Sequence, residues 1–136
     1  MQRDELARIA RTWFDEVLTN RNPAAIDVTY AESYVFHGNG APPTSKAGAK
    51  ALAEMLLGAS SDRRAFVDAQ VVEGDTVVTR WHSEGTHTGT MFGVPPTGRH
   101  MVVSGITITR VKDGLIVEEW ESNNAPLVVA SLREPE

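Results

Sequence analysis

The sequence contains no cysteine, so disulfide bonds, thiolate nucleophiles and cysteine-ligated metal sites are all excluded. Positive charge is also scarce, because 13 lysines and arginines stand against 18 aspartates and glutamates, for a formal net charge of −5. A protein that binds nucleic acid needs a basic surface to displace counterions from the phosphates. We therefore expect no nucleic-acid partner.

Long apolar runs are absent as well. No segment approaches the roughly 18 apolar residues of a membrane-spanning helix. The first eleven residues are charged and lack the apolar core of a signal peptide, and no basic amphipathic stretch indicates binding to a membrane surface. We expect a cytoplasmic protein with no membrane partner. The length of 136 residues fits one domain, residues 1–136, with enough chain to bury a core and a pocket.

The first half of the chain shows helical periodicity. Apolar residues spaced three and four apart predict one amphipathic helix over about Asp4–Leu18. Pro23 fits the first position of a second, short helix with Asn22 as its cap. Tyr34–His37 is expected to be a short strand that runs into a loop. Ser45 is a good cap for a third helix.

The second half predicts antiparallel strands. Ala65–Val72 and Thr76–Thr88 flank a Glu-Gly-Asp turn signal. His100–Val111 and Leu115–Ser122 flank a Lys-Asp-Gly turn signal. A short helix from about Pro126 to Leu132 completes the chain. Helices first and antiparallel strands later predict an α+β fold rather than a parallel α/β fold.

An acidic cluster near the end of the last predicted strand offers the most chemistry. Side chains alternate along a strand, so Glu119, Glu121 and Asn123 share one face. The other face carries Glu118 and Trp120. If Glu119 and Glu121 line a pocket, burial and mutual repulsion raise the pKa of at least one of them, which makes a general acid or base near neutral pH. The alternative is a solvated acidic edge, since glutamates are seldom buried.

The four histidines show no metal-binding spacing, so we expect no metal site. His37 ends a predicted strand beside a loop, and His87 lies in a glycine-flanked segment. Either could donate a hydrogen bond to a substrate carbonyl, although a structural role is commoner for a single histidine. Asn124 most simply caps the last helix. Trp13 and Trp81 fit the core or the wall of a pocket.

Three segments of the second half carry a family resemblance. Residues 85–89 read GTHTG, residues 93–99 read GVPPTGR, and residues 110–120 read RVKDGLIVEEW. Together they resemble the SnoaL-like polyketide cyclases of the nuclear-transport-factor-two-like superfamily, well over residues 77–124 and more loosely over the N-terminal helices. The resemblance implies a cone-shaped fold, in which a curved antiparallel sheet and three to four helices enclose a pocket. It also implies a homodimer that forms through the sheet.

The same resemblance implies a reaction. The family's cyclases close a ring by intramolecular aldol condensation of a polyketide ester, without metal or cofactor. A carboxylate removes a proton next to a carbonyl, and nearby polar groups stabilise the enolate. That carboxylate is an aspartate in the family pattern, and its position is Glu121 here. The position two earlier, often histidine in the family, is Glu119, while His37 and His87 match positions where the family often has histidine.

The chain departs from the family pattern at the enolate-binding positions. Gly105 and Thr107 stand where cyclases can carry glutamine and histidine, and Asn124 stands where the family often has aspartate. Because a site displaced by about 1 Å can lose on the order of a hundredfold in rate, other reactions stay open beside cyclisation. Hydration, dehydration, isomerisation or epoxide opening need only a carboxylate and oxygen-binding donors. A non-catalytic homodimer that binds a small molecule is a third alternative.

We predict a cofactor-free acid–base enzyme of the polyketide cyclase type that acts on a hydrophobic carbonyl compound. The expected catalytic residues are Glu121 as general base, Glu119 and His87. The expected substrate-binding residues are Trp13, His37, Trp81, Thr107, Asn123 and Asn124.

Overall fold

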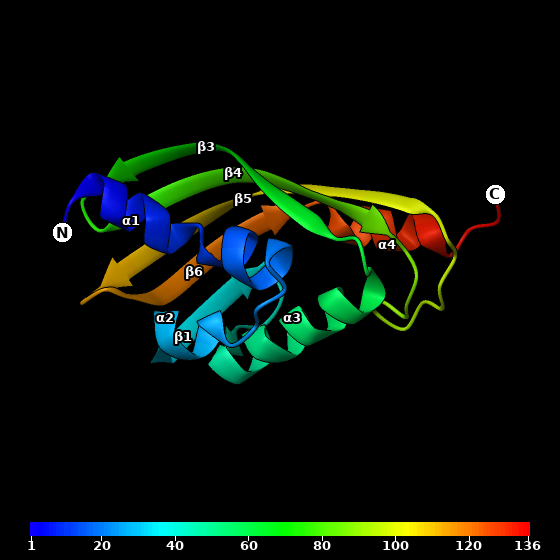
Figure 1. Ribbon diagram of the computed structural model, residues 1–136, viewed down its shortest axis with the longest axis horizontal. Coiled ribbons are helices and arrows are strands. Elements are labelled where there is room, and N and C mark those ends of the chain that lie inside the picture. The colour runs from blue at the N-terminus through cyan, green and yellow to red at the C-terminus, as the bar shows by residue number, and fades with distance from the viewer.

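The computed structural model describes all 136 residues, which fold around one curved, unclosed sheet (Figure 1). The strands lie in the order β2-β1-β6-β5-β4-β3. Strands β1 and β6 pair parallel, and every other pair is antiparallel. The strands are β1 Tyr30–Gly38, β2 Thr44–Ser45, β3 Arg64–Glu73, β4 Thr76–Thr86, β5 His100–Lys112 and β6 Leu115–Asn123. The predicted α+β fold is confirmed.

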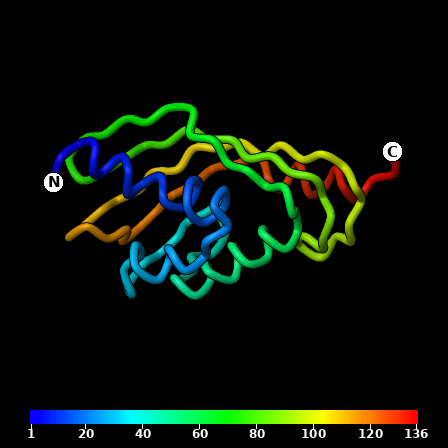
Figure 2. The backbone as a smooth tube through the Cα atoms, in the orientation of Figure 1, coloured from blue at the N-terminus to red at the C-terminus, as the bar shows by residue number.

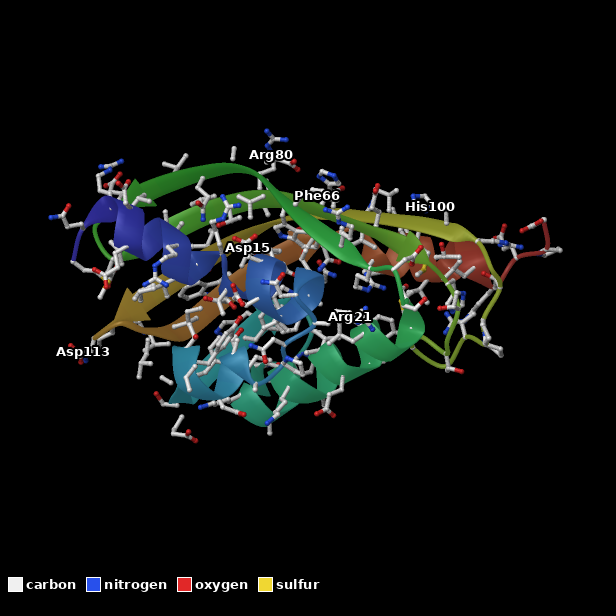
Figure 3. All side chains as sticks on the ribbon, viewed as in Figure 1. Asp15, Arg21, Phe66, Arg80, His100 and Asp113 are labelled. Carbon is white, nitrogen blue, oxygen red and sulfur yellow. The ribbon has the colours of Figure 1, made fainter.

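Helices cover one face of this sheet, and the two chain ends lie at its opposite ends (Figure 2). The helical segments are α1 Arg3–Ala10, a π-helix η1 Trp13–Thr19, α2 Ala25–Thr29, α3 Lys46–Ala59 and α4 Ala125–Leu132. None of them has the length and apolar character that crossing a bilayer requires. The other face of the sheet is open, and Phe66, Arg80 and His100 point outward from it (Figure 3).

The helix predicted over Asp4–Leu18 is two segments. After α1, the chain widens into the π-helical turn of η1, in which the Asn20 amide donates to the Asp15 carbonyl five residues earlier at 3.1 Å. The Thr12 hydroxyl at the junction donates to the Ile9 carbonyl at 2.7 Å, which competes with the regular helical ladder. π-Helical turns often occur at functional sites, and η1 contributes to the cavity described below.

The remaining helices and strands lie close to their predicted bounds, except for β1. Strand β1 begins at Tyr30, four residues before the predicted start at Tyr34. The Ser45 hydroxyl caps α3 as expected, because it accepts from the Gly48 amide at 3.3 Å. The two predicted hairpins, β3–β4 and β5–β6, both form.

Two of the predicted helix caps are wrong. Helix α2 begins after Ala24, and the Asn22 side chain does not cap it. Asn124 precedes α4 but has φ −97° and ψ 14°, outside the extended conformation from which a side chain caps a helix. Its Oδ1 accepts from the Ser104 amide at 2.9 Å instead. The Ala125 amide donates to Oδ1 of Asn123 at 2.9 Å, so the preceding asparagine satisfies this amide of α4.

Two apolar clusters form the core between the sheet and the helices. The larger one joins α1, η1 and α2 to the sheet and includes Phe14, Val17, Ile26, Tyr30, Trp81 and Ile116. The smaller one lies at the other end and consists of Ala59, Met91, Val94, Met101, Val129 and Leu132. Members of both clusters line a cavity.

Candidate active site

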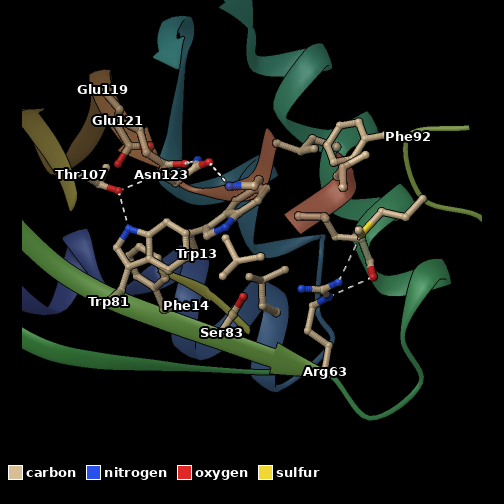
Figure 4. Close-up of a pocket in the computed structure, with 17 residues that line it drawn as sticks. Trp13, Phe14, Arg63, Trp81, Ser83, Phe92, Thr107, Glu119, Glu121 and Asn123 are labelled. Carbon is tan, nitrogen blue, oxygen red and sulfur yellow. Dashed lines mark hydrogen bonds between the residues drawn. The ribbon is translucent and has the colours of Figure 1, made fainter. Parts of the chain in front are cut away.

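The cavity has a volume of about 100 Å³ and lies under the helix-covered face of the sheet (Figure 4). Of its 17 lining residues, 11 are apolar, and the aromatic ones are Trp13, Phe14, Trp81 and Phe92. Its polar lining residues are Arg63, Ser83, Thr107, Glu119, Glu121 and Asn123. An apolar wall with a few convergent polar groups is typical of a site for a small molecule.

A wider hollow of about 520 Å³ adjoins the cavity on the solvent side. The two spaces share Leu52, Phe92, Asn123, Ala125 and Val129 as lining residues. Phe92 is 44% exposed, so its ring lies at the boundary between the protein interior and solvent. We infer that a ligand enters the cavity through this hollow.

Strand β6 directs two carboxylates into the cavity. Glu119 and Glu121 are two residues apart, so they share the inner face of the sheet with Asn123. Glu118 and Trp120 lie on the outer face. Alternation alone did not show which face of this strand is buried. The structure shows that Glu119 and Glu121 face the interior and that Glu118 faces the surface.

Glu119 is buried, with 6% of its surface exposed. The Tyr34 hydroxyl donates to its Oε1 at 2.7 Å, and the Thr109 hydroxyl donates to its Oε2 at 2.5 Å. Burial raises the pKa of Glu119 from 4.5 to about 7, and the charge of Glu121 adds to the rise, whereas the two hydrogen bonds oppose it. Near neutral pH, Glu119 therefore holds or releases a proton.

Glu121 is held by a directed chain of hydrogen bonds. The Thr107 hydroxyl donates to its Oε1 at 2.7 Å, and the Asn123 amide nitrogen donates to its Oε2 at 2.7 Å. Trp81 Nε1 donates to the Thr107 hydroxyl oxygen at 2.9 Å (Figure 4). Because an indole N–H only donates, the Thr107 hydroxyl oxygen accepts this bond. The hydroxyl hydrogen of Thr107 is therefore the one that forms the hydrogen bond to Glu121. Burial raises the pKa of Glu121, and the bonds from Thr107 and Asn123 oppose the rise.

Gly105 leaves room for this chain of hydrogen bonds. A Cβ atom at position 105 would lie 2.8 Å from Cζ2 of Trp81 and 2.7 Å from the Ser122 carbonyl oxygen. Both distances are shorter than real Cβ contacts, so only glycine lets the Trp81 ring lie here. At position 107 the structure places a polar contact, because the Thr107 hydroxyl donates to the carboxylate of Glu121.

Two predicted substrate-binding residues lie outside the cavity. His37 is on the outer face, where its Nε2 lies 2.8 Å from Oε2 of Glu118 and its ring stacks on Trp120. Asn124 binds the backbone of Ser104. Neither residue lines the cavity, contrary to the prediction, because alternation along β1 turns His37 outward and the start of α4 turns Asn124 toward β5.

His87, the third predicted catalytic residue, is also outside the cavity. It follows the end of β4, is fully buried and is covered by the segment Thr97–Arg99. Its Nδ1 accepts from the Thr97 amide at 3.2 Å and lies 2.9 Å from the Thr97 hydroxyl. These contacts hold the loop, and His87, unlike Glu119 and Glu121, does not line the cavity.

The cavity brings together six of the predicted residues and several unpredicted ones. The predicted residues are Trp13, Trp81, Thr107, Glu119, Glu121 and Asn123. Sequence reasoning missed Thr109, although the β5–β6 hairpin register places it opposite Glu119, as it places Thr107 opposite Glu121. It also missed Arg63 and Tyr34. No group of three or more His, Asp or Glu side chains could hold a metal ion.

Comparison with known proteins assigns the family. The family model of the SnoaL-like polyketide cyclases matches residues 8–127. The chain belongs to the SnoaL-like polyketide cyclase family. No protein with curated annotation matches this SnoaL-like protein significantly.

Solved structures of other proteins share the fold of this SnoaL-like protein over nearly its whole length. A candidate SnoaL-like polyketide cyclase from Jannaschia sp. CCS1 matches with a TM-score of 0.86 at 20% identity, over 98% of this chain and 94% of that one. IdmH from Streptomyces antibioticus, a candidate polyketide cyclase, gives 0.79 at 26% identity, over 93% and 97%. AclR from Streptomyces galilaeus, a candidate hydroxylase, gives 0.78 at 25% identity, over 98% and 82%. Proteins that share this fold are thus described either as candidate polyketide cyclases or as a candidate hydroxylase.

Proposed function

We propose that this SnoaL-like protein is a cofactor-free acid–base enzyme that removes a proton next to the carbonyl of a hydrophobic small molecule, and that the reaction is an intramolecular aldol cyclisation. The observation that carries the proposal is the placement of Glu121. Its carboxylate faces a mostly apolar cavity, and burial raises its pKa. A carboxylate that has lost water is a stronger proton acceptor than one in bulk solvent.

Glu121 acts as the general base in this proposal. Thr107 and Asn123 each donate to one of its oxygens, so the carboxylate keeps one orientation toward the cavity. Glu121 takes the proton from the carbon next to the carbonyl, and the electron pair of that C–H bond moves to give the enolate. The enolate carbon then attacks a second carbonyl of the same molecule, and the new alkoxide takes up a proton.

Glu119 supplies the second proton. With a pKa of about 7, it is protonated in about half of the molecules at pH 7. It lines the same cavity as Glu121, and the charge of Glu121 is one of the causes that raise the pKa of Glu119. Two carboxyl groups in different environments can therefore hold one proton between them, which allows one to accept while the other donates.

Hydrogen–deuterium exchange tests this proposal without knowledge of the natural substrate. The probes are the methyl ketones 4-oxopentanoate, 6-oxoheptanoate and 4-acetylbenzoate, with their methyl esters, incubated with the protein in D₂O and followed by proton NMR. We expect the wild type to accelerate loss of the protons next to the ketone, and Glu121→Gln to lower that acceleration by at least about a hundredfold.

Glu118→Gln is the matched control, because it removes an adjacent carboxylate from the outer face and should change the exchange rate less than twofold. The proposal is wrong if the wild type exchanges no probe faster than buffer does, or if Glu121→Gln exchanges as fast as the wild type. Circular dichroism of each variant establishes that it is folded.

A different reaction of the same groups is the second candidate, because the match to AclR, a candidate hydroxylase, links this fold to a function other than cyclisation. Hydration, dehydration, isomerisation or epoxide opening would use Glu121 in the same way. Mass spectrometry of a product separates them, since isomerisation leaves the mass unchanged and hydration adds one water. Loss of one water fits either dehydration or an aldol cyclisation that ends in dehydration, which the carbon skeleton distinguishes. Ligand binding that survives loss of both carboxylates would instead indicate a binding module.

Two further expectations, a homodimer and a cytoplasmic location, stay predictions. The outer face of the sheet supports the homodimer, because Val102, Ile106, Ile108 and Trp120 expose between 38% and 48% of their surface there. A monomer by light scattering at working concentration would contradict it.

A further inference from the structure

Arg63 places a buried positive charge in the cavity, at the end away from the two carboxylates (Figure 4). Only 5% of its surface is exposed, and it is the one basic side chain among the lining residues. It forms no ion pair, although eight other pairs occur in the structure. Burying a charge without a partner of opposite charge costs free energy, so Arg63 requires an explanation.

The present partners of Arg63 are all uncharged. Its Nε donates to the Leu56 carbonyl at 3.1 Å, and its Nη2 donates to the Ser60 hydroxyl at 3.3 Å and approaches Sδ of Met91 at 3.8 Å. Its Nη1 forms no hydrogen bond to the protein. Burial lowers the pKa of Arg63 and the charge of Arg21 adds to the lowering, whereas the charge of the neighbouring Asp62 opposes it. A guanidinium nevertheless stays charged at neutral pH.

A structural role at the end of α3 accounts for part of this arrangement. The free carbonyls at a helix C-terminus carry about half a negative charge and attract cations. Arg21, on the surface, already binds this helix end, because it donates to the Leu57 carbonyl at 2.7 Å and to the Ser60 carbonyl at 3.0 Å. Two guanidiniums therefore share the partial negative charge of one helix end. The carboxylate of Asp62 accepts hydrogen bonds from Thr86, so Arg63, which faces the cavity, forms no ion pair.

Building on the proposed function, we propose that Arg63 is an anion subsite and that the substrate is an oxo acid. The carboxylate of the substrate pairs with Arg63, its apolar body lies against Trp13 and the other apolar lining residues, and its ketone reaches Glu121 at the other end. A carboxylate matches the planar donor fork of a guanidinium in charge and in shape. An ester of the same acid offers no charge and cannot form this pair.

Binding of matched acids and esters tests this subsite without turnover. The probes are 4-oxopentanoate, 6-oxoheptanoate and 4-acetylbenzoate, each compared with its methyl ester at pH 7.5 by ligand-observed NMR titration. We expect at least one acid to bind the wild type about tenfold more tightly than its ester, the size of a charge-assisted hydrogen bond. In Arg63→Gln, the two affinities should differ less than twofold.

Arg21→Gln is the matched control. It removes a guanidinium from the same helix end but not from the cavity, so it should keep the tenfold preference for the acid. If both variants lower the stability and neither changes the preference, Arg63 serves only the helix and the proposal is overturned. It is also overturned if no acid binds the wild type more tightly than its ester. That comparison needs no variant, so a misfolded Arg63→Gln protein does not weaken it.

Failure of the subsite and failure of the proposed reaction give different results. Preference for an acid without deuterium exchange would retain the subsite and remove the acid–base reaction. Deuterium exchange without preference for an acid would retain the reaction and remove the subsite.

Discussion

On the outer face of β6, Glu118 contacts two basic side chains, whereas on the inner face its neighbour Glu119 accepts from two uncharged hydroxyls. His37 lies 2.8 Å from Glu118, and Arg110 donates to it at 3.3 Å, so the pKa of Glu118 falls below its ordinary value. Burial raises the pKa of Glu119 to about 7. The comparison teaches that the face of the strand, rather than the residue type, determines which glutamate can exchange a proton near neutral pH.

Glu119→Gln is expected to have the largest effect on stability, and the effect depends on pH. The native pKa of Glu119 is raised from 4.5 to about 7, so the native state binds this proton more tightly than the unfolded state does. The free energy of unfolding of the wild type therefore loses up to about 3 kcal/mol from this group as the pH rises from about 4.5 to about 7. Glutamine does not titrate, so the variant should not show this loss.

Urea unfolding of both proteins between pH 4.5 and pH 8 measures this difference. Glu118→Gln is the control from the outer face, and its curve should run parallel to that of the wild type over this range, because the lowered pKa of Glu118 acts only below about pH 4.5. A lowered native pKa stabilises the protein above the unfolded pKa, and that contribution is lost as the pH falls. Parallel pH curves for the wild type and Glu119→Gln would contradict the buried, raised state of Glu119.

Gly105→Ala should cost about 2 kcal/mol, because the added methyl group overpacks the inner face against Trp81 and Ser122. Ser104→Ala, the neighbouring position on the outer face, should change the free energy of unfolding by less than about 0.5 kcal/mol. Equal effects of the two substitutions in urea unfolding would show that the inner face tolerates a Cβ at this position.

Thr107→Val should cost about 1 kcal/mol, because it leaves the Trp81 indole N–H without an acceptor inside the protein. It also removes a hydrogen bond that lowers the pKa of Glu121, so the midpoint of the pH profile of deuterium exchange should move up. Thr90→Val, at an exposed position, should change neither quantity. An unchanged midpoint in Thr107→Val would separate Thr107 from the proposed base.

The smallest effect is expected for the ion pairs of Glu118. This residue lies at the surface, where solvent screens its attraction to His37 and Arg110. The stability difference between the wild type and Glu118→Gln at pH 7 should shrink further when the salt concentration is raised from 0.05 M to about 1 M. If the stability difference between the wild type and Glu118→Gln did not change with salt, solvent would not screen these ion pairs, and the prediction would be wrong.

Much of the fold could be predicted because local signals and long-range pairing agree. The turn at Asp113 and Gly114, both at positive φ, joins β5 to β6 where the sequence shows Lys-Asp-Gly. The family resemblance then implied one curved sheet with helices around a pocket, although it did not predict the parallel pairing of β1 with β6. The break between α1 and η1 could not be predicted, because an apolar stripe looks the same in a regular helix and in a widened one. It follows from the Thr12 hydroxyl bond and from packing.

The site was harder to predict than the fold. Alternation paired Glu119 with Glu121 but left their face open, since both faces of β6 mix apolar and acidic residues. Arg63 stands in a Ser-Ser-Asp-Arg-Arg segment that looks like a solvated loop, and only the packing of α3 and Met91 around it makes it a buried residue. His37 and His87 carry suitable chemistry, but alternation along β1 places His37 on the outer face, and His87 lies under the loop that covers it.

The place of β6 in the sheet determines when the acid pair can join the fold. Strand β6 follows the other five strands in the sequence and so leaves the ribosome after them, yet it lies between β5 and β1. Until it inserts, β1 has only the two residues of β2 as a sheet neighbour. The segment that joins the two halves of the sheet therefore also delivers Glu119 and Glu121. A nascent chain that stops before this strand lacks both the sheet's central connection and its proton-handling groups.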